Sequence, residues 1–390
     1  MRSIGRTLLF ACIYLVVAGA NAESRISGYI KNYSFVQDEI DFGSVSSDAL
    51  YSSQFSGRFM LDVLSVDKAR YSFQVHYELG REFNSDDIGS LGFSSRNAYR
   101  LTDIEAVPGD TGKKSRNQQN LDRFNVQVNL DSGDLTVGRQ PITFGAARII
   151  NPTDIFLPFD VRTLNTEYRV GIDAIRFQRP IGQLSELDIG VVLGADGSDN
   201  SAAFGRLKSN LRGSDFELTF IRFSQQSLFG FGIETTLGQF GSWLETAVVS
   251  GDVDYSRTSL GLDYGFNARW LGMLEYHYNG AGADNPDDYL DLLSSTPYLA
   301  GGVFLLGKHY LLPSLRWQVS PLTTVSLQLI ANLEDESVFT NLSADFSLNE
   351  NLYLGLSYFG FSGDKPDLTK LNSEYGSNPD RLIASLRFYF

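Results

Sequence analysis

Apolar and polar residues alternate along most of this chain, in segments of about ten residues each. The alternation is clearest in the C-terminal third, where Val325, Leu327 and Leu329 share one face and Ser326 and Gln328 share the other. A period of two is that of a β-strand, because successive side chains point to opposite sides of a sheet. The pattern therefore predicts strands with one apolar and one polar face.

The connections between these segments include very short turns and much longer loops. The short turns are residues 131–134, 320–321 and 349–351. The longer loops are residues 83–120, 143–168, 281–303 and 363–379. This asymmetry is typical of outer-membrane barrels, which have tight periplasmic turns and longer external loops.

Counting the segments gives eighteen strands. Their centres lie near residues 30, 59, 75, 126, 138, 175, 190, 206, 219, 232, 246, 260, 274, 314, 327, 342, 356 and 386. An even count suits a single-chain bacterial barrel, whereas a soluble β-sandwich of this length would divide into domains. We predict an all-β fold, a single transmembrane antiparallel β-barrel of about 18 strands with both chain ends on the periplasmic side.

The first 22 residues form a targeting segment. Basic Arg2 and Arg6 precede an apolar run, and the small residues A-N-A follow at 20–22. These are the parts of a secretory signal peptide, and the apolar run is short for a membrane anchor. We expect cleavage after Ala22, which leaves residues 23–390 as the barrel.

Composition then narrows the classes of function. The net charge of −14 becomes −16 once the two leader arginines are removed, and the only cysteine, Cys12, also lies in the leader. So acidic a chain is a poor partner for nucleic acid, which is bound by clustered Lys and Arg. The three histidines are scattered, and the acidic loop at 284–288 has the composition of solvated surface. We expect no cofactor, no metal site and no catalytic centre.

The last nine residues, L-I-A-S-L-R-F-Y-F, carry the strongest single signal. Leu382, Ala384 and Leu386 alternate onto one face with Phe388 and the terminal Phe390. This closely resembles the β-signal by which outer-membrane barrels are recognised for assembly. We therefore expect the barrel-assembly machinery as a partner, together with outer-membrane lipid and lipopolysaccharide.

Charged residues fall on the polar face of the predicted strands, which is the lumen. A charge facing lipid at mid-membrane costs about 2 to 4 kcal/mol, so this placement independently supports a barrel. Both signs are present, and most of these charges are expected to form ion pairs that stiffen the wall. The principal lumenal cations are Arg58, Arg123, Arg257, Arg316 and Arg387.

The alternation breaks in residues 136–156. Strict parity would put Arg139 on the same face as Val137, but Pro141 and several glycines permit a bend that turns side chains inward. The loop that follows is apolar for an exposed loop, which favours a loop folded into the barrel. The candidate constriction residues are Arg139, Arg148, Asp154, Arg162, Arg169 and Arg176.

This segment also resembles a known group. The order G-R-Q at 138–140, F-G at 144–145 and N-P-x-D at 151–154 looks like the strand and loop of porin-type outer-membrane proteins that export alginate and related exopolysaccharides. The resemblance implies an 18-stranded monomer whose arginine-rich constriction passes an anionic polymer. It also implies periplasmic export partners.

The sequence therefore predicts an outer-membrane channel for passive diffusion or export of hydrophilic solutes or polysaccharide. Two alternatives remain: a structural barrel that sheaths a partner protein, and a barrel hydrolase. The hydrolase has less support, because neither Glu275 and His277, which share one face, nor His309 on the next strand belongs to a local motif of outer-membrane phospholipases or proteases.

Overall fold

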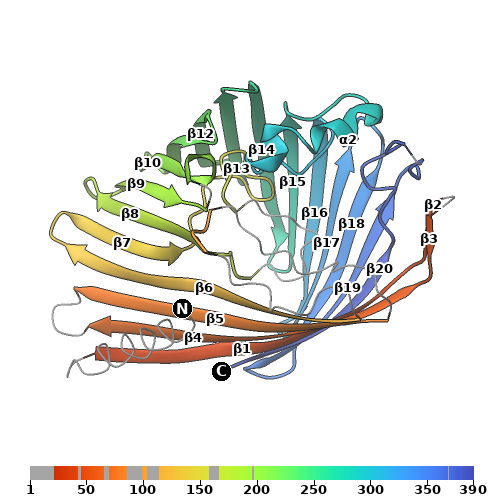
Figure 1. Cartoon of the computed structure of the whole chain (residues 1–390), viewed down its shortest axis with the longest axis horizontal. Helices are drawn as coiled ribbons and strands as arrows, with labels where there is room; N and C mark the ends of the chain where they lie inside the picture. The colour runs from red at the N-terminus through yellow and green to blue at the C-terminus, as the bar shows by residue number, and fades with distance from the viewer. Residues whose placement is uncertain are drawn as a thin grey trace.

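The computed structural model describes residues 22–42, 45–65, 70–85, 99–102, 114–157, 167–195, 197–367 and 369–390. Most of the predicted signal peptide, residues 1–21, lies outside this range. Eighteen of the strands form one antiparallel sheet, in which β1 pairs with both β4 and β20 and so closes the barrel (Figure 1). The predicted fold class and strand number are confirmed.

The barrel strands in chain order are β1 (Ala22–Gln37), β4 (Leu50–Ser65), β5 (Tyr71–Asn84), β6 (Ser115–Leu130), β7 (Gly133–Gln140), β8 (Ile172–Pro180), β9 (Ser185–Leu193), β10 (Ala202–Leu211), β11 (Ser214–Phe223), β12 (Gln226–Leu237), β13 (Phe240–Ser250), β14 (Tyr255–Asn267), β15 (Trp270–Asn279), β16 (His309–Ser320), β17 (Thr323–Asn332), β18 (Val338–Ser347), β19 (Leu352–Ser362) and β20 (Arg381–Tyr389). Each predicted centre falls within one of them. Two short strands, β2 (Ile40–Phe42) and β3 (Val45–Ser47), form a hairpin after β1.

The two ends of the barrel differ. At one end, here called the turn end, β1 begins and β20 ends. The strands are joined there by tight turns such as Arg212-Gly213, whose φ angles of 55° and 83° are those of a type I′ hairpin. At the loop end, the long connections span 85–114, 141–171, 280–308 and 363–380. The first is shorter than predicted, because hydrogen-bonded pairing of β5 with β6 extends to Ser115.

Among the described residues, the helices are short. These are η1 (Gly197–Asn200), η2 (Pro286–Asp288), α2 (Tyr289–Leu292) and α3 (Thr296–Leu299). Among the described residues, none of the helices has the length and apolar character needed to cross a membrane.

The outer face of the barrel is apolar. The side chains of Leu382, Leu386, Phe388 and Phe390 point outward and are between 41% and 64% exposed, while Arg387 between them points to the lumen. The same alternation is present on the other strands, with exposed Phe220, Phe229, Val248 and Leu260 as examples. Such a belt of apolar side chains suits contact with lipid hydrocarbon.

The interior has two zones. Along β11 the inward residues run from Glu217 and Thr219 near the turn end to Ile221 and Phe223 near the loop end, and all four are buried. The polar lining that the strand pattern predicted is found mainly in the half nearer the turns. In the other half, apolar inner-facing side chains pack against loops that fold into the barrel, and buried polar residues such as Arg257 and His277 lie among them.

Candidate functional site

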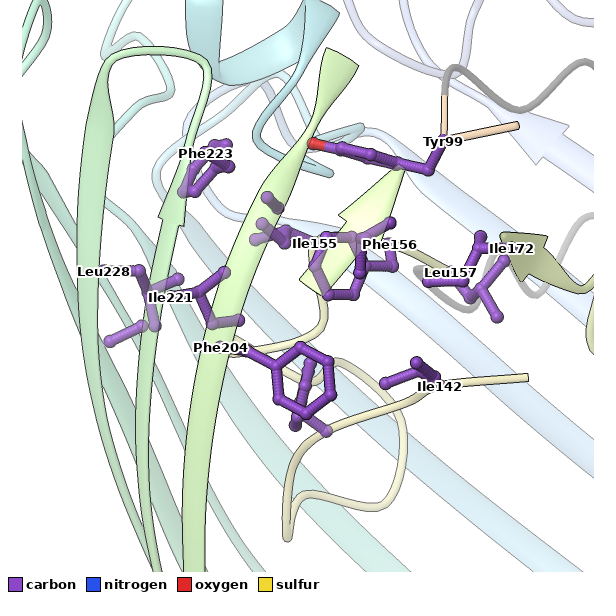
Figure 2. Close-up of a cluster of buried hydrophobic side chains, with 14 of the residues drawn as sticks. Tyr99, Ile142, Ile155, Phe156, Leu157, Ile172, Phe204, Ile221, Phe223 and Leu228 are labelled. Carbon is purple, nitrogen blue, oxygen red and sulfur yellow. The ribbon is translucent and has the colours of Figure 1, made fainter. Parts of the chain in front are cut away.

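The connection between β7 and β8, residues 141–171, is called the inner loop. Its described parts are 141–157 and 167–171, and it passes through the middle of the barrel (Figure 1). The side chains of Ile155 and Phe156 pack against Phe204 of β10 and Ile221 of β11 (Figure 2). A loop with apolar residues at these positions gains stability by leaving water, which explains why it folds inward.

Glu245 of β13 holds the backbone of the inner loop. Its carboxylate accepts hydrogen bonds from the N–H groups of Ala146 and Ala147 at 2.7 and 2.8 Å. It also accepts from the N–H and the hydroxyl of Thr153 at 2.8 and 2.7 Å. Backbone N–H groups removed from water need such partners, and a carboxylate can serve several of them at once.

Two more glutamates continue this anchorage. Glu275 of β15 accepts from the N–H groups of residues 148–150 at 3.1, 3.2 and 2.8 Å, and from the indole N–H of Trp243 at 2.8 Å. Glu217 of β11 accepts from the N–H of Gly145 at 3.2 Å. Alternate strands therefore present carboxylates to consecutive parts of the loop.

Glycines on β12 give the loop room to approach the wall. A Cβ atom on Gly230 would lie 2.3 Å from the Thr153 methyl carbon, and one on Gly232 would lie 3.0 Å from the Ala146 side chain. The absence of side chains at these two positions is what lets the loop reach the carboxylates on the neighbouring strands.

Arg148 extends from this anchored segment into the lumen. Its side chain is 50% exposed, and it forms an ion pair with Glu234 of β12 at 2.8 Å. Its guanidinium carbon lies 5.6 Å from the centre of the Trp243 ring. Because the amides of residues 148–150 are bound to Glu275, the backbone that carries this cation is held in place.

The end of the inner loop contacts the opposite wall. Glu167 accepts from the ammonium of Lys31 on β1 at 2.6 Å and from the hydroxyl of Tyr389 on β20 at 2.6 Å. Six strands, β14 to β19, separate these contacts from Glu245 on β13. The described parts of one loop thus touch both sides of the barrel, so the loop crosses the lumen.

Arg139 is a structural residue in this arrangement. The predicted bend is present at Gly138, which has a φ angle of 117°. Arg139 is only 5% exposed, and its guanidinium binds Asp173 at 2.8 and 2.9 Å and the carbonyl oxygens of Leu121 and Thr102. These contacts join β6, β7 and β8 to residues 99–102, and they leave little of Arg139 available to a solute.

A bulge in β6 gathers two of the predicted lumenal arginines. The register shifts beside Arg123, so the side chains of both Asp122 and Arg123 are buried inside the barrel, whereas strict alternation would turn only one of two neighbours inward. Asp122 is fully buried and pairs with Arg123 at 2.8 Å and with Arg58. Its other oxygen accepts from the N–H of Gly171 at 2.8 Å, which fixes the end of the inner loop. Sequence analysis missed Asp122, because a bulge leaves no signal in an alternating pattern.

Arg176 and Arg257 are also bound to protein acceptors. Arg176 pairs with Asp188 on the neighbouring strand at 2.7 Å. Arg257 is buried and donates to the carbonyl oxygens of Pro152 and Gly301. They brace the wall and the loop.

Two lumenal arginines lie in the half nearer the turns. Arg316 is exposed on β16 and has no ion pair among the described residues. Arg387 of β20 pairs with Asp345 and, at 3.5 Å, with Glu167. The predicted constriction residue Arg162 lies outside the described residues.

Asp154 and Arg169 fold the two parts of the inner loop together. The Arg169 guanidinium lies 3.2 Å from the Asp154 carboxylate, which also accepts from the N–H of Leu157. Complete burial raises the pKa of Asp154 to about 7, and the attraction of Arg169 offsets only part of that effect. At Glu167 burial also opposes ionisation, but hydrogen bonds from Lys31 and Tyr389 hold the pKa below its usual value.

A serine and a histidine approach each other inside the barrel. The hydroxyl of Ser259 lies 2.8 Å from Nδ1 of His277, and both residues are buried. The same hydroxyl donates to the carbonyl of Ile150 at 2.6 Å. This pair serves as a further anchor of the inner loop.

No protein-family model and no curated protein matches the sequence. Solved structures do match in three dimensions. OpdQ of Pseudomonas aeruginosa has a TM-score of 0.60 at 11% identity, over 94% of this chain and 99% of that chain. OccAB4 of Acinetobacter baumannii has a TM-score of 0.58 at 11% identity, over 96% and 99%.

The outer membrane protein OpdK of Pseudomonas aeruginosa gives a TM-score of 0.58 at 9% identity, over 94% and 98% of the two chains. At these identities the likeness is one of fold. The chain has the fold of outer-membrane porins.

Proposed function

We propose that this protein is an outer-membrane channel through which small hydrophilic solutes diffuse, and that the inner loop forms its constriction. The apolar outer belt and the porin fold support an outer-membrane location, and the targeting segment predicted at 1–22 agrees with it. The observation that carries the proposal is the crossing of the lumen by a loop anchored at Glu245 on one side and Glu167 on the other.

The same observation favours small solutes over an extruded polysaccharide. A loop bound to both walls narrows the lumen, and its apolar residues pack against the strands and other loops in the half nearer the loops. We infer that Arg148 is the solute-facing cation of this constriction, because its backbone is fixed while half of its side chain remains exposed. Cations of this kind bias a pore toward anions.

Conductance across a planar lipid bilayer tests this proposal. Arg148→Gln should shift the chloride-to-potassium permeability ratio toward potassium by about two- to fivefold, the order expected for one charge in a hydrated pore. Asp131→Asn, a charge change in an exposed turn, is the matched control and should leave the ratio unchanged.

Two outcomes would count against the proposal. An unchanged ratio in Arg148→Gln, with the barrel folded, would remove the loop cation from the conduction path. Folded barrels that insert into the bilayer but conduct no ions would favour the alternative of a barrel that sheaths a partner protein.

A further inference from the structure

A hollow of about 460 Å³ lies near the turn end of the barrel, between the end of the inner loop and strands β18 to β20. Its lining residues are Glu167, Asp345, Glu350, Tyr353, Arg387 and Tyr389. This volume is in the range of sites that take small organic molecules.

The lining is acidic where it is accessible. Three carboxylates face one guanidinium, so the formal charge of the lining is −2. Asp345 has a side chain 52% exposed, and Glu350 is exposed on the turn, whereas the side chain of Arg387 is only 18% exposed. A solute entering the hollow therefore meets carboxylate oxygens before it meets the arginine.

Arg387 is already engaged by acidic partners. Its guanidinium reaches across β19 to Asp345, and its other terminal nitrogen lies 3.5 Å from Glu167. Gly355 makes this possible, because a Cβ atom there would lie 3.4 Å from both Arg387 and Asp345 and 2.5 Å from the hydroxyl of Ser385. The guanidinium is thereby neutralised, which lowers its attraction for an incoming anion.

Tyrosine rings supply the rest of the wall. The rings of Tyr353 and Tyr389 are 5.7 Å apart and meet edge to face at 83°. Their faces carry partial negative charge, which attracts cations.

The protein already holds an ammonium group beside this hollow in the same kind of setting. The Lys31 nitrogen lies 4.0 Å from the centre of the Tyr29 ring, 5.5 Å from that of Tyr389 and 2.6 Å from Glu167. Tyr389 and Glu167 thus border both the buried lysine and the hollow. Tyrosine rings and a carboxylate stabilise the Lys31 ammonium, and the hollow is lined by the same kinds of group.

We propose that this hollow is a binding site for small organic cations that carry an ammonium or guanidinium group. The carboxylates of Asp345 and Glu350 pair with the charged group, and the rings of Tyr353 and Tyr389 contact the attached carbon chain. The site is separate from Arg148 and does not depend on conduction, so it goes beyond the proposed channel function.

Isothermal titration calorimetry of the barrel in detergent micelles tests the site, with agmatine as the probe and 4-guanidinobutyrate as its control. Both carry the same guanidinium, but the control has a carboxylate in place of the second cation. We expect measurable binding of agmatine that weakens as salt is raised, and weaker binding of the control. Equal binding affinities for the two compounds would overturn the proposal.

Two variants locate the binding. Glu350→Gln should weaken agmatine about threefold, as loss of one exposed ion pair does, and it removes no described side-chain contact. Tyr353→Leu should weaken it by a similar factor, about threefold, because it removes a ring face. Asp131→Asn is the matched control on another turn and should bind as the wild type does. Unchanged affinity in both variants, with heat-modifiable mobility retained, would exclude this hollow as the site.

Discussion

At the scale of single residues, the position of the inner loop depends on carboxylates that bind backbone amides. A loop inside a barrel lacks the strand partner that would normally accept hydrogen bonds from its N–H groups. Glu245 and Glu275 supply those acceptors from the wall. Each buried N–H that loses its acceptor costs about 1 to 3 kcal/mol, so a carboxylate that serves several of them contributes strongly to the loop's position.

Replacing Glu245 should therefore release the loop. In Glu245→Ala, the N–H groups of Ala146, Ala147 and Thr153 lose their acceptor, and we expect single-channel conductance to rise and its noise to increase. The barrel should still form, since its sheet does not involve this side chain.

Glu186→Ala is the matched control for this prediction. Glu186 lies on β9, and among the described residues its side chain accepts a hydrogen bond only from the side chain of Gln178. Its variant should conduct like the wild type. If both variants had the conductance of the wild type, Glu245 would not be the residue that holds the inner loop in the constriction.

At the scale of elements, the last strand closes the barrel. The N–H of Phe390 donates to the carbonyl of Gly28 at 3.0 Å, and the N–H of Gly28 donates back to Phe390 at 2.9 Å. The Phe390 ring covers Gly28, where a Cβ atom would lie 2.6 Å from it. The terminal residue of the predicted β-signal is therefore also part of the seam between β1 and β20.

Removing Phe390 should lower the yield of closed barrel. We expect a smaller heat-modifiable fraction in outer membranes, because the seam loses two backbone hydrogen bonds and an aromatic contact. Phe220→Ala removes an outward aromatic side chain far from the seam and should assemble nearly as the wild type does. Normal assembly without Phe390 would contradict its part in recognition and closure.

At the scale of the whole molecule, the barrel has a polar half near the turns and a packed half near the loops. Lys365 lies in the connection 363–380 at the loop end, and Asn349 lies in a turn at the other end. If the loop end faces outward from the cell, the constriction is approached from outside past packed loops and from the periplasm through a hydrated vestibule.

Cysteine labelling of intact cells checks this orientation. The mature chain contains no natural cysteine if the leader is removed, so single substitutions give a clear signal. Lys365→Cys should react with a membrane-impermeant maleimide, and Asn349→Cys should react only after the cells are opened. Labelling of Asn349→Cys alone in intact cells would reverse the orientation.

The sequence alone determined the eighteen barrel strands and, where a strand has no bulge or bend, the face that each residue occupies. This was possible because one face of a strand in a membrane barrel contacts lipid and the other contacts protein or water, so apolar and polar residues alternate with a period of two. The same constraint made Arg387 a lumenal residue and its neighbours Leu386 and Phe388 outward ones.

Only the tertiary structure decided which lumenal charges are bound by other groups of the protein and which remain accessible to a solute. Arg139 reads as a solute-facing cation in sequence, yet Asp173 and two carbonyl oxygens bind it. Arg148 looks much the same in sequence but remains half exposed. Their difference arises because a loop's path across a barrel depends on partners far away in the chain, such as Glu245 and Glu275, and no local period records such contacts.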